Sequence, residues 1–413
     1  MEQLLAVTRL ADHEPGQDDS VENMVAFSSP RRSVWGTGGI AARIHLPAPW
    51  PENVHLVAEA LSQIQIEDEV GSPGSGPVAF GALPFDRSAA ANLVIPQVIH
   101  GHAAEGARWR TEIAPIGGTG SSAVTPEGNG EALPAVQSAT PSTVDLRSVR
   151  SARDWCAAVE AATTRIKAGE LTKVVLAREL LVQTDTPISA TQLYRRLLQL
   201  YPAALCFVID GFVGASPELL VSRVGEIVRA HPMAGTTPRT GDVDLDQRRA
   251  NELLSSQKNR KEHQITIDMV HETLLPWCSY LDAEPVPSVV AAGPVQHLAS
   301  SVEGRLSRPT PNVLDLVAAL HPTPAVGGWP REPALKLIDE LEQADRGPYA
   351  GPVGWTDAQG NGAFAVGIRA VELSDCSARL FAGVGVVADS DPESELEETR
   401  AKAQALLGAI VRV

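Results

Sequence analysis

The sequence predicts an α+β fold in which antiparallel strands carry helices on the outside. Three short apolar runs, bounded by Gly, Ser and Pro, follow one another at 204–210, 212–224 and 226–236. Consecutive strands without intervening helices are typical of hairpins. Two more strand-like runs lie late in the chain, at 362–373 and 378–387. Because helices do not alternate with these strands, the pattern disfavours a doubly wound parallel sheet.

The N-terminal third differs in character from the rest of the chain. It contains strand-like segments at 78–85 and 91–99 and ends in a stretch at 115–145 that is rich in Gly, Ser, Thr and Pro. Such a stretch, without apolar periodicity, predicts a mobile loop. We therefore expect residues 1–145 to form a variable N-terminal part and residues 146–413 the core, both belonging to one continuous domain.

The part after the loop shows helical spacing of apolar residues at several places. The pattern predicts helices at 154–170, 189–202, 244–275 and 392–410. Between the first two, the segment 171–184 is rich in β-branched residues and long enough for a strand.

Composition excludes several classes of function. The chain has 413 residues, 44% of them hydrophobic and 20% charged, which is enough to bury a sizeable core. Its net charge of -16 makes nucleic acid and anionic membranes poor partners, so an anionic substrate would need a local basic cluster or a divalent metal. The four cysteines form no C-x-x-C pair, which argues against a zinc site or a disulfide framework. No export signal or apolar membrane segment is visible, so we expect a cytoplasmic protein.

The predicted last helix carries an acidic stripe beside its apolar one. Glu395, Glu398 and Lys402 share one side of the helical wheel. The neighbouring core stripe consists of Leu396, Thr399, Ala403, Leu407 and Ile410. The acidic stripe can be a solvated face with a salt bridge to Lys402, or part of a site. Gly383 and Gly385 favour the site, because they bring bare backbone close to the helix start.

Three further charged residues stand in apolar surroundings. Glu262 lies on a helix among Ile, Met and Val, where it can pair with a basic residue or join other glutamates around Mg²⁺. Lys173 lies inside an apolar strand, where burial would favour the neutral amine of a general base, although a lysine that reaches out to water is the commoner arrangement. Burial of Glu218 would raise its pKa and suit a general acid.

The ordered motifs of the chain resemble those of chorismate-utilising enzymes, and most closely those of isochorismate synthases. The resemblance is dense from about residue 154 to 413 and rests on the segments AGELTKVVLAREL, GASPELLVSR, AGTTPR, KNRKEH, PVQHLAS, HPTPAVGG, DRGPYAGPVGW, GIRAVEL and AGVGVVADSDPESELEETRAKA. It implies two large antiparallel sheets packed together, helices outside them, and an active site in a deep groove of a chorismate-binding core. It also implies a monomer.

The resemblance assigns a role to each candidate residue. It implies that Lys173 is the base that activates water and Glu218 the acid. It implies that Glu262 and Glu398 hold Mg²⁺, with Glu395 as a further or alternative ligand. Substrate-binding positions implied in the same way are Gly235, Thr236, His297, Ala325, Tyr349, Arg369, Gly383, Gly385 and Lys402.

Three positions separate the members of the family. Anthranilate synthases have glutamine where this chain has Lys173, and aminodeoxychorismate synthases have lysine where it has Ala234. Salicylate synthases, which go on to eliminate pyruvate from isochorismate, typically have threonine where it has Ala325. The resemblance therefore favours an isochorismate synthase, with a salicylate synthase or a catalytically silent chorismate-binding relative as alternatives.

Overall fold

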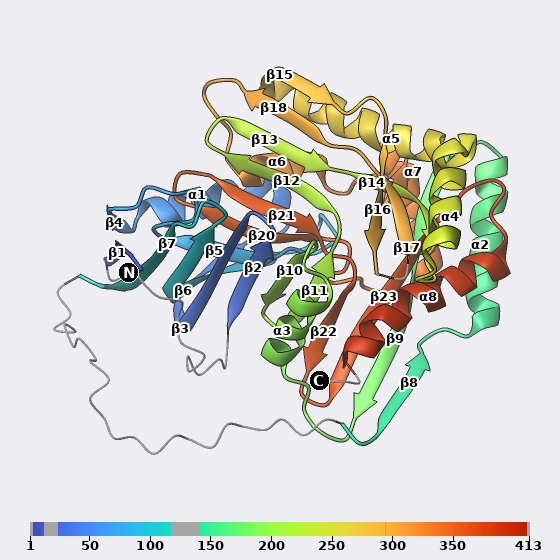
Figure 1. The fold of residues 1–413 in the computed structure, drawn as a ribbon, viewed down its shortest axis with the longest axis horizontal. Coiled ribbons are helices and arrows are strands. Elements are labelled where there is room, and N and C mark those ends of the chain that lie inside the picture. Colours follow the sequence, from blue (N-terminus) through green and yellow to red (C-terminus); the bar gives the residue numbers. More distant parts are fainter. Residues whose placement is uncertain (1–2, 12–23, 117–140, 294, 411–413) are drawn as a thin grey trace.

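The computed structural model describes residues 3–11, 24–116, 141–293 and 295–410. Within them, strands form one hydrogen-bonded network of 20 strands and a separate sheet of three, β14, β17 and β16. Every described pairing is antiparallel except that of β1 with β4, and helices cover the outside (Figure 1). The predicted α+β class is confirmed. Most of the predicted loop at 115–145 lies outside the described residues.

The N-terminal part is built mainly from long hairpins around a buried Trp50. Its strand β5 pairs with β20 and its strand β2 with β10, so it shares the large sheet with the rest of the chain. Its elements are β1 (Leu4–Leu10), β2 (Val25–Ser29), β3 (Arg32–Leu46), η1 (Trp50–Asn53), α1 (His55–Ser62), β4 (Gln65–Asp68), β5 (Val78–Ala82), β6 (Ala91–Ala103) and β7 (Arg108–Pro115).

The middle of the chain contains the predicted run of hairpins. The expected helices at 154–170 and 189–202 and the strand at 171–184 are confirmed as α2, β9 and α3. The elements are β8 (Val144–Ser148), α2 (Ala152–Lys167), β9 (Lys173–Thr184), α3 (Ala190–Leu200), β10 (Leu205–Ile209), β11 (Phe212–Ser216), β12 (Leu219–Val224), β13 (Ile227–His231), β14 (Met233–Pro238), α4 (Val243–Ser255) and α5 (Gln257–Leu274).

The last third returns to the same sheet and ends in the predicted helix at 392–410, confirmed as α8. The elements are η2 (Leu275–Trp277), β15 (Cys278–Ala283), β16 (Ser288–Ala292), β17 (Val295–Ala299), β18 (Val302–Leu306), α6 (Val313–Leu320), β19 (Gly328–Trp329), α7 (Arg331–Glu342), β20 (Pro352–Asp357), β21 (Gly362–Val366), β22 (Ala370–Ser374), β23 (Ser377–Val386) and α8 (Pro392–Ile410).

Four predicted elements are each divided in the structure, the runs at 212–224 and 226–236 into β11 and β12 and into β13 and β14. The single helix expected at 244–275 is wrong, because Ser256 is extended and separates α4 from α5. Its side chain accepts a hydrogen bond from the Asn259 amide, so this serine caps α5 instead of continuing α4. The strand expected at 362–373 is divided into β21 and β22, and Arg369, between them, has a left-handed φ of 54°.

The pairing of β9 with β23 fixes the framework of the site. Val175 lies opposite Gly385, and Ala177 lies opposite Gly383. Helix α8 follows β23 and packs against both that strand and α2, while α5 packs against β14 (Figure 1). Residues from β9, β23, α5 and α8 therefore face a common space.

A buried ion pair ties three segments around this space. Arg346 and Glu342 are only 2% and 3% exposed in their side chains, and the Arg346 Nε lies 2.8 Å from Glu342 Oε2. Arg346 also donates to the Val326 and Val175 carbonyls, and Glu342 accepts from the Ala177 amide. Strand β9 and the loop before β19 are thus held to the end of α7.

Removal of one member of this pair should be strongly destabilising. We expect Arg346→Met to lower the free energy of unfolding by about 3 kcal/mol or more, because the Glu342 carboxylate would stay buried without its partner. The double variant Glu342→Leu/Arg346→Met should lose less, which denaturant unfolding of the three proteins would measure. A double variant as unstable as the sum of both single changes would contradict this account.

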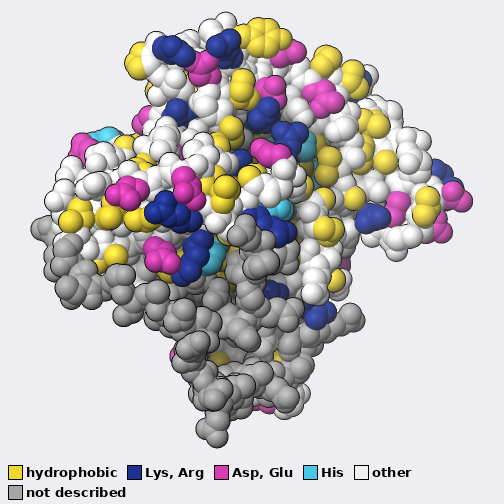
Figure 2. Space-filling model, turned by 60° about the vertical axis from the view of Figure 1, so that its left-hand side comes forward, with side chains coloured by type: hydrophobic (Ala, Val, Ile, Leu, Met, Phe, Trp, Pro, Cys, Tyr) yellow, Lys and Arg dark blue, Asp and Glu magenta, His cyan; other side chains and the backbone are white. Residues whose placement is uncertain are grey.

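The charge pattern of the surface and the composition of the helices are relevant to which partners the protein can bind. On the face drawn in Figure 2, basic and acidic side chains lie interspersed among hydrophobic and uncharged ones, so the coloured part of that face has no continuous basic area. Among the described helices, none combines the length and the apolar composition needed to cross a bilayer.

Candidate active site

A cavity of about 340 Å³ lies between β9, β14, β23, α5 and α8. Every candidate residue named from the sequence lines it, although the chain contributes them from segments more than 200 residues apart. These residues are Lys173, Glu218, Gly235, Thr236, Glu262, His297, Ala325, Tyr349, Arg369, Gly383, Gly385, Glu395, Glu398 and Lys402.

The most buried ionic contact of this cavity joins Lys173 to Glu262. Lys173 begins β9 and its side chain is 3% exposed, and its Nζ lies 2.6 Å from Glu262 Oε1. Burial would raise the pKa of Glu262, but Lys173, together with Lys402 and Lys258, outweighs burial and holds that pKa below its usual value. A Cβ on Gly385 would lie 2.9 Å from Lys173 Cε and 3.2 Å from Glu262 Oε1, so a side chain there would press on both members of the pair.

Glu218 occupies a different kind of environment. It lies in the turn between β11 and β12, is 3% exposed and has no ion pair among the described residues. Burial raises its pKa to about 8, against the opposing effects of the Met233 amide, which hydrogen-bonds it, and of Lys173. The carboxyl is therefore protonated at neutral pH and can donate a proton.

The acidic stripe of α8 faces the cavity and also contains the salt bridge considered as its alternative. Lys402 Nζ lies 2.6 Å from Glu398 Oε1 and donates to the Gly383 carbonyl at 2.8 Å. Burial, and to a lesser degree Glu398, raise the pKa of Glu395. A carboxylate destabilised in this way gains from a nearby cation.

The carboxylates fit a hard divalent cation by type but do not form a finished site. Among the described residues, no three His, Cys, Asp or Glu side chains converge closely enough to hold a metal ion. Glu262 and Glu398 are each paired with a lysine, while all three glutamates line one cavity. An oxygen donor set of this kind suits Mg²⁺ once the lysines release the carboxylates.

His297, Arg369 and Tyr349 form the polar end of the cavity. His297 Nδ1 lies 3.2 Å from the Gly235 carbonyl, which can only accept, so Nδ1 carries the proton. Its Nε2 then faces Arg369 Nη2 at 3.5 Å. Burial, with repulsion from Arg369, lowers the pKa of His297 to about 3, so the imidazole is neutral. Burial also raises the pKa of Tyr349 to about 12, which keeps its phenol protonated.

Several lining residues were not singled out by the sequence reasoning. Lys258 lies one turn before Glu262 on α5, and its charge helps to lower the pKa of that glutamate. The i, i+4 spacing from Glu262 was the available signal. The others missed are mostly apolar and carry no chemical signature in the sequence: Val175, Pro217, Met233, Val326, Ile368, Phe381 and Ala382.

The arrangement suits a small anionic substrate. Lys173, Lys258, Arg369 and Lys402 bring positive charge into the cavity of a chain whose net charge is -16. A protonated carboxyl and a buried lysine in the same cavity give it a proton donor and a potential acceptor.

Comparison with known proteins agrees with this chemistry. The family model for chorismate binding enzymes matches residues 52–411. The chain belongs to this family.

Characterised relatives cover most of the chain. It is 38% identical over 365 residues to the isochorismate synthase DhbC of Bacillus subtilis (strain 168), covering 86% of this chain and 84% of that protein. It is 32% identical over 390 residues to the isochorismate synthase EntC of Escherichia coli (strain K12), covering 93% and 94%. The solved structure of the menaquinone-specific isochorismate synthase MenF from Escherichia coli covers 99% of this chain and 95% of its own, with a TM-score of 0.82. At 22% identity, that likeness establishes the fold alone.

A methyl group at Gly385 should disturb the ion pair behind it. We expect Gly385→Ala to lower the free energy of unfolding by about 1–3 kcal/mol, because the new Cβ would press on Lys173 and Glu262. Gly408→Ala on α8 is the control, since nothing lies within 4 Å of a Cβ there and alanine should be neutral or stabilising. Equal stability of the two variants in denaturant unfolding would mean that the pair is not tightly packed.

Because the pKa of Glu218 is raised in the folded protein, the free energy of unfolding should depend on pH. The folded protein holds a proton on Glu218 up to about pH 8, whereas the unfolded carboxyl loses it near pH 4.5. Burial of this group therefore costs increasing free energy as the pH rises between those values. We expect Glu218→Gln to gain melting temperature relative to the unmodified protein from pH 5 to pH 8, and the exposed Glu397→Gln to show no such trend.

Proposed function

We propose that this protein is an isochorismate synthase, which converts chorismate to isochorismate with the help of Mg²⁺. The single observation that carries the proposal is that one cavity contains both the buried, protonated carboxyl of Glu218 and the buried amine of Lys173. Relatives that are isochorismate synthases by name span most of the chain, which supports the same activity.

The proposed reaction needs an acid and a base at two ring carbons. Lys173 takes a proton from water as the water oxygen bonds to C2 of the ring. Glu218 gives its proton to the hydroxyl that leaves C4, and the ring double bonds shift to accommodate both changes. One water enters and one leaves, so substrate and product are isomers. Proton exchange with solvent restores both side chains.

Lys173 cannot accept a proton while it is paired with Glu262. The 2.6 Å contact engages its Nζ in an ion pair with the carboxylate. The Glu262 carboxylate must therefore turn to another partner before water is activated. This requirement links the base to whatever cation the carboxylates hold.

The remaining cavity residues bind and orient the substrate. Arg369 and Tyr349 hold the enolpyruvyl carboxylate, Lys402 and the backbone at Gly383 and Gly385 lie at the ring carboxylate, and Gly235, Thr236 and His297 border the ring. Glu262 and Glu398, with Glu395 as a further or alternative ligand, would hold Mg²⁺. When bound there, the metal would supply positive charge to the ring carboxylate and draw electron density from the diene.

Three positions favour this member of the family over its relatives. Lys173 suits water as the nucleophile, Ala234 leaves no lysine nucleophile, and Ala325 lacks the hydroxyl associated with pyruvate elimination. All three residues line the cavity.

Incubation with chorismate tests the function directly. We expect the purified protein to convert chorismate to isochorismate with added Mg²⁺ and to lose this activity with a chelator, as chromatography of the products would measure. No loss of chorismate in the presence of Mg²⁺ would refute the proposal and favour a silent binding relative.

Glu398→Gln should separate a metal-holding carboxylate from a solvated one. We expect this variant to fold normally and to lose about 100-fold or more in turnover, since it removes a charge from the Mg²⁺ site but keeps the side-chain volume. The control is Glu397→Gln, one residue away, whose carboxylate pairs with Arg400 and is 65% exposed. Comparable kcat and Mg²⁺ dependence in both variants would show that Glu398 does not hold the metal.

Product identity is tested at Ala325. We expect the unmodified protein to release isochorismate with little salicylate, and Ala325→Thr to raise the salicylate fraction by at most about tenfold, since one hydrogen bond is worth about 0.5–1.5 kcal/mol. The fraction is read from products at neutral pH. Salicylate as the main product of the unmodified protein would instead identify a salicylate synthase.

A further inference from the structure

A second cavity of about 400 Å³ adjoins the one described above. Pro217, Met233 and Arg369 line both, so they form a wall between the two. The remaining walls of this distal cavity come from the end of α3 and the loop after it, from β11, β13 and β16, from Arg239 after β14, and from α8. Because Met233 also hydrogen-bonds Glu218 through its amide, the wall is in contact with the proposed acid.

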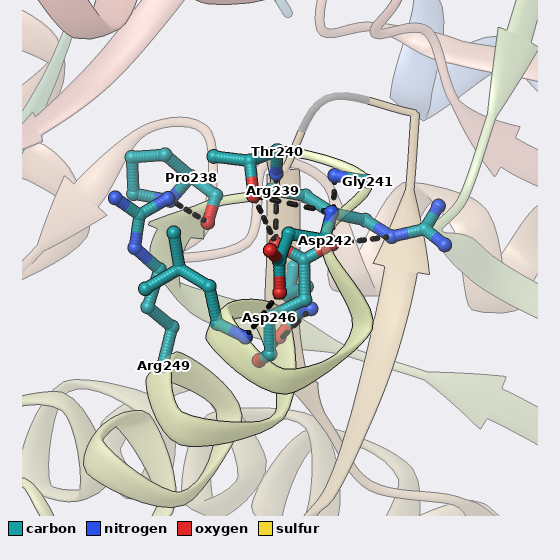
Figure 3. A network of polar contacts seen from close by, with 9 residues as sticks. Pro238, Arg239, Thr240, Gly241, Asp242, Asp246 and Arg249 are labelled. Atoms are coloured by element: carbon teal, nitrogen blue, oxygen red, sulfur yellow. Dashed lines mark hydrogen bonds and ion pairs between the residues drawn. The ribbon is translucent and has the colours of Figure 1, made fainter.

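The distal cavity is lined by positive charge without a compensating carboxylate. Its lining contains Arg239 and Arg369 and no Asp or Glu among the described residues. Arg239 reaches Asp246 only at 3.5 Å through Nε. Asp246 already accepts from the Thr240 and Gly241 amides at 2.7 and 2.9 Å. Figure 3 shows the terminal nitrogens of Arg239 directed away from that turn, so they are available to an anion.

Arg369 is the second cation of the distal cavity. Among the described residues it forms no ion pair, and its hydrogen bond to His297 is long, at 3.5 Å. Burial lowers the pKa of Arg369, while the nearby Tyr349, Glu398 and Tyr201 act in the opposite direction. A desolvated guanidinium in this situation gains from a carboxylate on either side of the wall.

Apart from the two arginines and His231, the lining of the distal cavity is mostly apolar and consists largely of small side chains. Tyr201 closes one side, where a Cβ on Gly293 would lie 3.3 Å from its ring. The apolar lining residues are Leu200, Pro202, Ala203, Ala204, Ala215, Val290, Ala291, Ala292 and Leu406. Such walls accommodate a flat or compact apolar body, while the two arginines select one carboxylate.

We propose that the distal cavity binds a small aromatic monocarboxylate and that this binding opposes binding of chorismate. The carboxylate pairs with Arg239 and Arg369, and the ring lies against Tyr201 and the alanines of β16. This inference rests on the proposed function in one respect, that chorismate uses Arg369 from the first cavity. Since one guanidinium cannot satisfy both carboxylates fully, each ligand weakens the other by the same factor.

The site can be tested by binding alone, with benzoate as the probe and no chorismate present. We expect isothermal titration to show saturable binding of benzoate to the unmodified protein. Arg239→Gln should weaken it about tenfold or more, through loss of a charged hydrogen-bonding partner. Ala292→Trp, which fills the cavity without changing charge, should weaken it as well. The matched control is Arg249→Gln, because Arg249 lies on α4 beside this turn, donates to the Pro238 carbonyl and does not line the cavity.

The same variants exclude binding in the first cavity. Lys402 lines only the first cavity, so benzoate bound there would be weakened by Lys402→Gln and untouched by Arg239→Gln. That outcome, or the absence of saturable binding, would overturn the proposal. Neither result depends on turnover, so the distal site and the proposed function can fail separately.

Kinetics test the coupling. With chorismate as substrate, benzoate should raise KM to a plateau, typically about 5- to 150-fold for coupled sites, and Arg239→Gln should abolish this plateau. A KM that rises without limit would mean direct competition in the first cavity, and a KM unaffected by saturating benzoate would mean that the two sites are not coupled.

Discussion

The ion pair between Lys173 and Glu262 is the constraint on which the site depends. A lysine and a glutamate that are this far from water must either be neutral or find each other, and here their atoms meet at 2.6 Å. The pair joins the first residue of β9 to the first half of α5, and Gly385 on the neighbouring strand leaves room for it. The ion pair also engages the proposed base, so Glu262 would have to release Lys173 before that lysine could activate water.

The Glu342–Arg346 ion pair fixes the segments that carry the site. It forms hydrogen bonds with two backbone positions of β9 and with the loop that carries Ala325. The strand that bears Lys173 and the loop that borders the substrate are therefore held to one helix end. A catalytic group gains precision when its supporting segments are fixed independently of the substrate.

The two cavities are each lined by cationic side chains and share one of them, Arg369. Met233, whose amide hydrogen-bonds Glu218, stands on the shared wall, and Arg369 lines both cavities. The left-handed backbone of Arg369, between β21 and β22, brings its side chain to this wall. The proposed acid and the proposed carboxylate holder are thus both sensitive to what occupies the second cavity.

The sequence by itself determined the fold class, most helices and strands, and the residue types of the site. Periodicity sufficed for α2, α3 and α8, and for the stripe of Glu395, Glu398 and Lys402, because neighbours on one helix are set by its turn. Gly383 and Gly385 could be singled out because bare backbone has few other uses beside a helix start.

Only the tertiary structure decided which charges meet. The partner of Glu262 is Lys173, from a strand nearly 90 residues earlier. The pKa of Glu218 is raised because other segments bury its carboxyl. The separation of α4 from α5 at Ser256 and the wall between the cavities likewise escaped prediction. Periodicity reports the direction of a side chain within its own element, whereas burial and ion pairing depend on elements that are distant in sequence and packed against it.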